Sequence, residues 1–64
     1  MELNWFINED HFEARTEIGT YMVGDWGGGK VSVRFPGGDS LIEKMSLQDG
    51  KDRAQRHYDE RRAA

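Results

Sequence analysis

The sequence predicts an α+β domain in which an antiparallel sheet of four or five short strands carries one C-terminal helix packed on one face. Residues 1–45 contain short segments of alternating apolar and polar side chains separated by turn-forming residues, the pattern of a sheet with one buried face. Residues 46–62 lack β-branched side chains and are rich in helix formers. The chain has 64 residues and no repeat or linker, so we expect residues 1–64 to form one domain, with residues 1–45 as the sheet and residues 46–62 as the helix.

Each strand is predicted from its own alternation and from the turn that ends it. Residues 3–7 form a first strand that turns at residues 8–10. Residues 11–18 alternate most clearly, with Phe12 and Ala14 on one face and His11 and Glu13 on the other. The later strands are expected at residues 20–26, 30–35 and 40–45, and a turn at residues 36–39 joins the last two.

Helix signals begin at Ser46, whose hydroxyl is a natural N-cap. Arg61 and Arg62 near the end of the segment complement the helix dipole. Gly50 lies inside the helix, where glycine costs about 1 kcal/mol relative to alanine. Close approach of the helix to the sheet is the reason we infer for it. The face expected to pack on the sheet carries Leu47, Gly50, Ala54, His57 or Tyr58, and Arg61.

A glycine-rich segment, residues 24–31, matches most of the phosphate-binding P-loop pattern through Gly24, Gly29 and Lys30. That pattern requires a serine or threonine after the lysine and then a helix. Here Val31 follows Lys30, and the next residues alternate as a strand. The sequence therefore predicts a hairpin turn with glycines at positive backbone angles.

No residue pattern indicates catalysis or metal binding. His11 and Glu13 share one strand face, but two ligands are too few for zinc, and the chain has no cysteine. We interpret both as a solvated sheet face, and His57 as a residue at the boundary between core and solvent. We expect no catalytic residue, no metal and no cofactor. A small hydrolase or nucleotide binder is one alternative function. Bound nucleotide would then raise the melting temperature of the protein.

The charge of the chain is concentrated in its first part. Net charge is −3, and residues 1–45 hold eight acids against four bases. An acidic surface of this kind suits a basic protein partner rather than DNA. The residues predicted to bind the partner are the carboxylates of the sheet and turns together with one tryptophan: Glu9, Asp10, Glu13, Glu17, Asp25, Trp26, Asp39 and Glu43.

Aromatic side chains leave two interpretations open. In so small a domain, most of Trp5, Phe6, Tyr21 and Trp26 are expected in the core. One or two of them, Trp26 first, are expected at the surface as binding anchors, because tryptophan and tyrosine dominate the energetics of protein interfaces.

The tail resembles the C-terminal pattern S-L-x-x-A-K-x-x-A-Q-x-x-Y of short orphan proteins from phages and prophages. The matching residues are Ser46, Leu47, Lys51, Gln55 and Tyr58, and Gly50 replaces the usual alanine. The match covers the last third of the chain, and its residues are structural, so no site carries over. In size and acidity the chain is also similar in type to anti-CRISPR proteins, which implies inhibition of a CRISPR–Cas complex at its DNA-binding surface.

These observations predict a non-enzymatic phage or mobile-element protein that inhibits a host macromolecular complex with a basic groove. The partner could be a Cas effector, blocked by a surface that mimics DNA. We expect no direct nucleic-acid or membrane contact, and a monomer rather than an oligomer. Met1 suggests a whole gene product, and the absence of a leader pattern suggests the cytoplasm of a bacterial host. The alternative is a nucleic-acid-binding accessory protein that uses helix arginines such as Arg53 and Arg56, with aromatics of the sheet.

Overall fold

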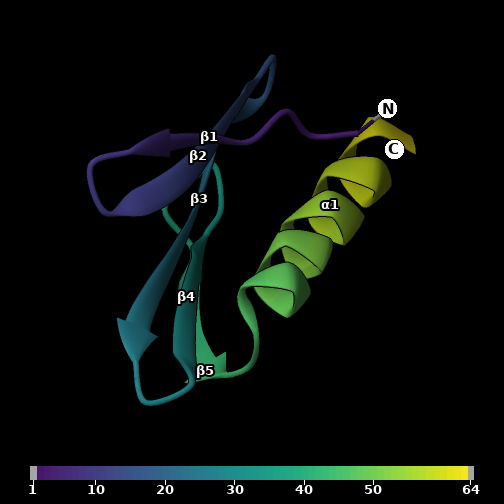
Figure 1. The fold of residues 1–64 in the computed structure, drawn as a ribbon. Helices are drawn as coiled ribbons and strands as arrows, with labels where there is room; N and C mark the ends of the chain where they lie inside the picture. The colour runs from purple at the N-terminus through teal and green to yellow at the C-terminus, as the bar shows by residue number, and fades with distance from the viewer. Residues whose placement is uncertain (1, 64) are drawn as a thin grey trace.

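The computed structural model describes residues 2–63 and confirms the α+β class, with a five-stranded antiparallel sheet and one C-terminal helix on it (Figure 1). The strands follow each other in the sheet in the order in which they occur in the chain. Their bounds are β1 Phe6–Asn8, β2 His11–Thr16, β3 Gly19–Gly27, β4 Lys30–Arg34 and β5 Ser40–Lys44, and the helix is α1 Leu47–Ala63.

The sheet has one face that packs on α1 and one face that does not, as the alternation of apolar and polar side chains predicts. Tyr21 and Val23 of β3 and Val31 and Val33 of β4 are fully buried on the side of the sheet that faces α1. On the opposite face, Ser32 aligns with Gly24 on one side and with Ile42 on the other. No helix covers this opposite face within residues 2–63, and we call it the open face.

Gly50 sets how closely α1 approaches the sheet. A Cβ atom on Gly50 would lie 2.9 Å from Cγ1 of Val31 and 3.1 Å from Cγ1 of Val23. Ala54, one turn later, is fully buried. The helix therefore rests on β3 and β4 through small side chains, which is the close approach inferred from the sequence.

Polar contacts also hold α1 in place. Ser46 caps the helix, because its Oγ accepts a hydrogen bond from the amide of Asp49 at 3.0 Å. The hydroxyl of Tyr21 lies 2.7 Å from Nδ1 of His57, and Tyr58 donates to Glu17 at 2.7 Å. Of the two helix residues left open by the sequence, Tyr58 is buried and His57 is half-buried.

The segment before β1 closes the far end of the core. Leu3 is buried, and its amide donates to Oε1 of Gln55 at 2.8 Å. This segment is not part of a strand, so the prediction of a strand at residues 3–7 is wrong: β1 spans only Phe6–Asn8. At Leu3, a hydrogen bond to α1 thus takes the place of strand pairing.

Candidate binding surface

The open face contains a hollow of about 290 Å³ next to Trp26. Residues from three strands and one turn line it: Asp10, His11, Met22, Gly24, Asp25, Trp26, Ser32 and Arg34. A second hollow of about 350 Å³ continues from Trp26 and Ser32 toward Ile42 on β5. Trp26 therefore stands between two adjoining depressions of one surface.

Trp26 is exposed and yet held in a fixed orientation. Its side chain is 70% exposed, and its Nε1–H donates to Oγ of Ser32 at 2.8 Å. Trp26 lies at an irregularity of the β3–β4 pairing, between Asp25 and Gly27. Gly24 leaves room for this contact, because a Cβ there would lie 3.3 Å from the Ser32 hydroxyl. Of the two interpretations of the aromatic residues, burial of most of them is wrong, because only Tyr21 is fully buried, and exposure of Trp26 is confirmed; its role as a binding anchor stays a prediction.

The turn after Trp26 confirms the hairpin predicted in place of a phosphate loop. Gly27, Gly28 and Gly29 all have positive φ, and β4 follows them directly. Asp25 accepts a hydrogen bond from the amide of Gly27 at 2.9 Å, which fixes its carboxylate beside the turn.

His11 and Glu13 form a hydrogen-bonded pair on the open face. Nε2 of His11 lies 2.9 Å from Oε2 of Glu13, and Asn8 donates to the same oxygen at 2.7 Å. The hydrogen bond from His11, followed by the one from Asn8, lowers the pKa of Glu13 below 4.5. The hydrogen bond to Glu13 raises the pKa of His11 above 6.5 despite some desolvation. Glu13 is only 6% exposed, so our interpretation of it as a solvated surface carboxylate is wrong.

The carboxylates predicted to bind a partner divide into separate groups. Asp10 and Asp25 line the same hollow, and Glu9 precedes Asp10 in the β1–β2 turn. Glu17 and Asp39 lie in the turns at the other end of the sheet. Of the predicted set, Asp10 and Asp25 thus line the hollow beside Trp26, and we call these two residues together with Glu9 the acidic end.

Besides Glu13, which bonds His11 and Asn8, two members of the predicted set bond residues of α1. Glu43 forms an ion pair with Arg53 of α1, with an N–O distance of 3.0 Å. Glu17 accepts the hydroxyl proton of Tyr58, and this hydrogen bond lowers the pKa of Glu17 below 4.5. Both carboxylates therefore contribute to the contact between sheet and helix.

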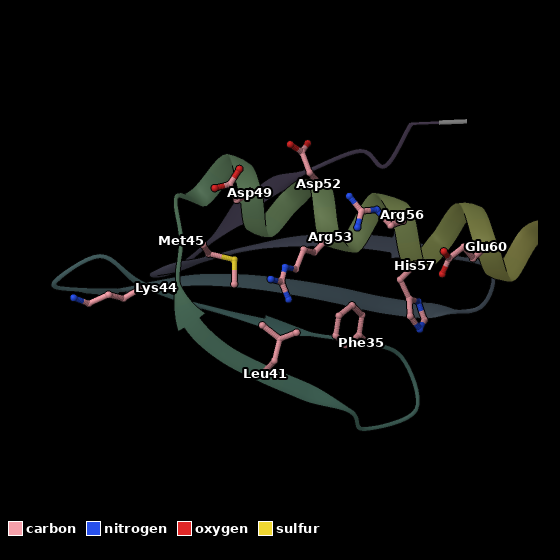
Figure 2. A pocket seen from close by; sticks show the side chains of 10 residues that line it. All are labelled: Phe35, Leu41, Lys44, Met45, Asp49, Asp52, Arg53, Arg56, His57 and Glu60. Carbon is pink, nitrogen blue, oxygen red and sulfur yellow. The ribbon is translucent and has the colours of Figure 1, made fainter.

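A groove of about 510 Å³ runs between α1 and β5 on the other side of the sheet (Figure 2). Phe35, Leu41 and Met45 form its apolar part, and charged side chains of α1, among them Arg53 and Arg56, form its rim. The groove exists because α1 lies over β3 and β4 and leaves β5 uncovered (Figure 1).

Metal-ligating side chains do not gather in the described part of the chain. Within residues 2–63, no three side chains of these types come together. Over the same range, no helix has both the length and the apolar character needed to cross a lipid bilayer.

Comparison with protein-family models, with curated proteins and with solved structures finds no match to this chain. Function is therefore inferred from the surface itself.

Sequence reasoning missed several residues of this surface, chiefly Met22, Ser32, Arg34 and Ile42. The alternation of β4 places Ser32 and Arg34 opposite the buried valines, and that signal was in the sequence. The irregularity at Trp26 could not be read from the sequence, because it depends on the pairing of β3 with β4.

Proposed function

We propose that the protein is a non-enzymatic binding protein that attaches to a basic region of a larger macromolecular complex through the open face around Trp26. The observation that carries this proposal is an exposed tryptophan whose indole is fixed by Ser32. A side chain that is already ordered loses little conformational entropy when it is buried by a partner.

The residues around Trp26 have the composition of a protein–protein contact. Met22 and Ile42 are apolar, and Arg34 lines both hollows beside Trp26. Tryptophan, methionine and arginine are the side chains enriched in such contacts, and tryptophan and arginine supply many of the energetic hot spots. The open face thus supports protein recognition over catalysis.

The acidic end supports a basic partner. Asp10 and Asp25 border the hollow in which Trp26 stands, and the Asp10 side chain is 97% exposed. Lysine or arginine side chains of a partner would meet both carboxylates and the indole face, which attracts cations. Such complementarity accelerates association and makes it sensitive to salt.

The resemblance to anti-CRISPR proteins implies a more specific proposal, in which the protein inhibits a CRISPR–Cas effector. The protein would then come from a phage and act in the bacterial cytoplasm. This inhibition stays a prediction. Its direct test is to add the protein to a purified effector before target DNA and to measure whether DNA binding falls.

The main test compares variants in affinity capture from host lysate, followed by measurement of Kd for each recovered protein. We expect Trp26→Ala to weaken the specific partner by about 2 kcal/mol or more, roughly 30-fold in Kd. Asp10→Asn with Asp25→Asn should slow association and reduce its salt dependence. Ile7→Ala is the control, since Ile7 is exposed on β1 away from Trp26. Partners bound equally by wild type and Trp26→Ala would refute the proposal.

The alternative is nucleic-acid binding, and one observation favours it. Four cationic side chains share the open face with Trp26, namely Arg15, Lys30, Arg34 and Lys44. A base could stack on the indole while these cations contact phosphates. A gel shift with a single-stranded oligonucleotide at low salt distinguishes nucleic-acid binding from the proposed protein binding. We expect no shift, and a shift abolished by Arg34→Gln would favour the alternative.

A further inference from the structure

β5 is the outer strand of the sheet, and its backbone pairs with β4 on one side only. Two hydrogen bonds just beyond the ends of the β4–β5 pairing show which backbone groups of β5 point toward β4. The amide of Phe35 donates to the carbonyl of Asp39 at 2.8 Å, and the amide of Met45 donates to the carbonyl of Gly29 at 3.0 Å. Both pairs are therefore hydrogen-bonded positions of the antiparallel ladder.

The rest of the ladder follows from this, because hydrogen-bonded and non-hydrogen-bonded pairs alternate in antiparallel strands. Leu41 and Glu43 direct their N–H and C=O groups toward β4. The backbone groups that point away from the sheet belong to Ser40, Ile42 and Lys44. Within residues 2–63 no other strand pairs with this edge, so β5 presents a row of donors and acceptors that can serve as a template for another strand.

This edge is complementary to itself. When two β5 strands run antiparallel with Ile42 opposite Ile42 of a second copy, Ser40 comes opposite Lys44 and Leu41 opposite Glu43. The three residues with outward backbone groups then face each other in hydrogen-bonded positions. No two like charges lie directly opposite, so Lys44 does not block the pairing as an edge lysine otherwise would.

Side chains on both faces support the same register. On the open face, Ile42 is 56% exposed and would meet Ile42 of the second copy directly. On the helix face, Leu41 lies at the bottom of the groove between α1 and β5, and Leu41 of the second copy would lie diagonally across from it (Figure 2). Because α1 does not cover β5, the second strand meets no helix at this edge.

In place of the monomer expected from the sequence, we propose that two copies of this chain associate by antiparallel pairing of their β5 strands about a two-fold axis at Ile42. The other edge is less suited, since β1 has three residues and the guanidinium of Arg15 lies over Phe6 at 5.0 Å. The two sheets become continuous, and the axis runs perpendicular to them. Both open faces, and both copies of Trp26, therefore lie on the same side of the dimer.

The test is sedimentation equilibrium from about 1 µM to about 1 mM, a range that covers the affinities of small interfaces. We expect wild type to dimerise within this range. Ile42→Lys places two lysines opposite each other and should raise the dimer Kd at least about tenfold. Ile7→Lys is the matched control: it makes the same change at an exposed isoleucine of the opposite edge and should leave the dimer Kd unchanged.

Amide hydrogen exchange supplies a second measurement that needs no variant. The amide of Ile42 should exchange fast in dilute protein and slowly in concentrated protein, whereas those of Leu41 and Glu43 should be protected in both. A wild type that stays monomeric throughout, equal dimerisation of Ile42→Lys, or loss of the dimer in Ile7→Lys would each overturn the proposal. Exchange at Ile42 that is independent of concentration would do the same.

Discussion

The burial of Glu13 could not be predicted from the sequence. Its position on the polar side of an alternating strand predicts a solvated carboxylate, and the alternation is correct. The structure nevertheless buries it, because Asn8 from β1 and His11 from β2 both bond its carboxylate. Which neighbours come within reach of a side chain depends on strand pairing, and the sequence pattern does not contain that pairing.

The His11–Glu13 pair predicts a pH dependence of stability. The pKa of His11 is raised above 6.5, so its contribution is fully present below pH 6.5 and is lost as pH rises through the raised value. The pKa of Glu13 is lowered below 4.5, so its contribution is present above pH 4.5 and is lost as pH falls through the lowered value. The pair therefore stabilises the fold most between pH 4.5 and 6.5.

Urea denaturation of wild type and His11→Gln measures this contribution. The difference in unfolding free energy should be largest near pH 5.5 and should shrink by about pH 8.5, because Gln does not titrate. Other titrating groups are common to both proteins and cancel in the difference. A difference that stays constant between these two pH values would contradict the prediction.

At the scale of elements, the sequence predicts most of the fold. The three central strands and α1 are confirmed with shifts of one or two residues, because their alternation, their glycine turns and the Ser46 cap are local signals. β1 differs most. Residues 3–5 look like a strand by composition, but the amide of Leu3 bonds Gln55 of α1 instead of a strand, and only the folded chain brings α1 there.

The contact between α1 and the sheet can be tested by replacing Gly50. Alanine is the better helix former by about 1 kcal/mol, so an exposed position would gain stability from a glycine-to-alanine change. In Gly50→Ala the added methyl group meets the stiff side chain of Val31, and we expect a net loss of about 1–3 kcal/mol. Thermal or urea denaturation measures it.

The double variant Gly50→Ala with Val31→Ala is the control for this contact. It should lose less stability than the sum of the two single variants, because removal of the valine methyl groups makes room for the methyl group added to the helix. Additive losses would show that the Val31 contact is not the cause.

For the molecule as a whole, the small size of the core limits the free energy of unfolding. A chain of 64 residues buries only about 60% of the surface that its unfolded form exposes, less than larger domains bury, so each buried side chain carries a large share of a stability of only a few kcal/mol. Leu3 is the one buried hydrophobic residue among residues 2–5. It joins the segment before β1 to α1 and so closes the core at one end.

Leu3→Ala should therefore cost about 2 kcal/mol or more in unfolding free energy, since it opens a cavity beneath the end of α1. Asn4→Ala, at the exposed neighbouring position, should change stability by less than about 0.5 kcal/mol. Calorimetric melting of the two variants measures both effects. Similar melting temperatures would mean that the segment before β1 adds nothing to the core.

The strand order, in which every strand pairs with its neighbour in the chain, also bears on how the molecule forms. Hairpins join residues close in sequence, and chains with such local contacts cross their folding barrier quickly. The valines of β3 and β4 stay in water until α1 covers them, and α1 is synthesised after the whole sheet. During translation, we therefore expect these valines to stay exposed until the helix has left the ribosome.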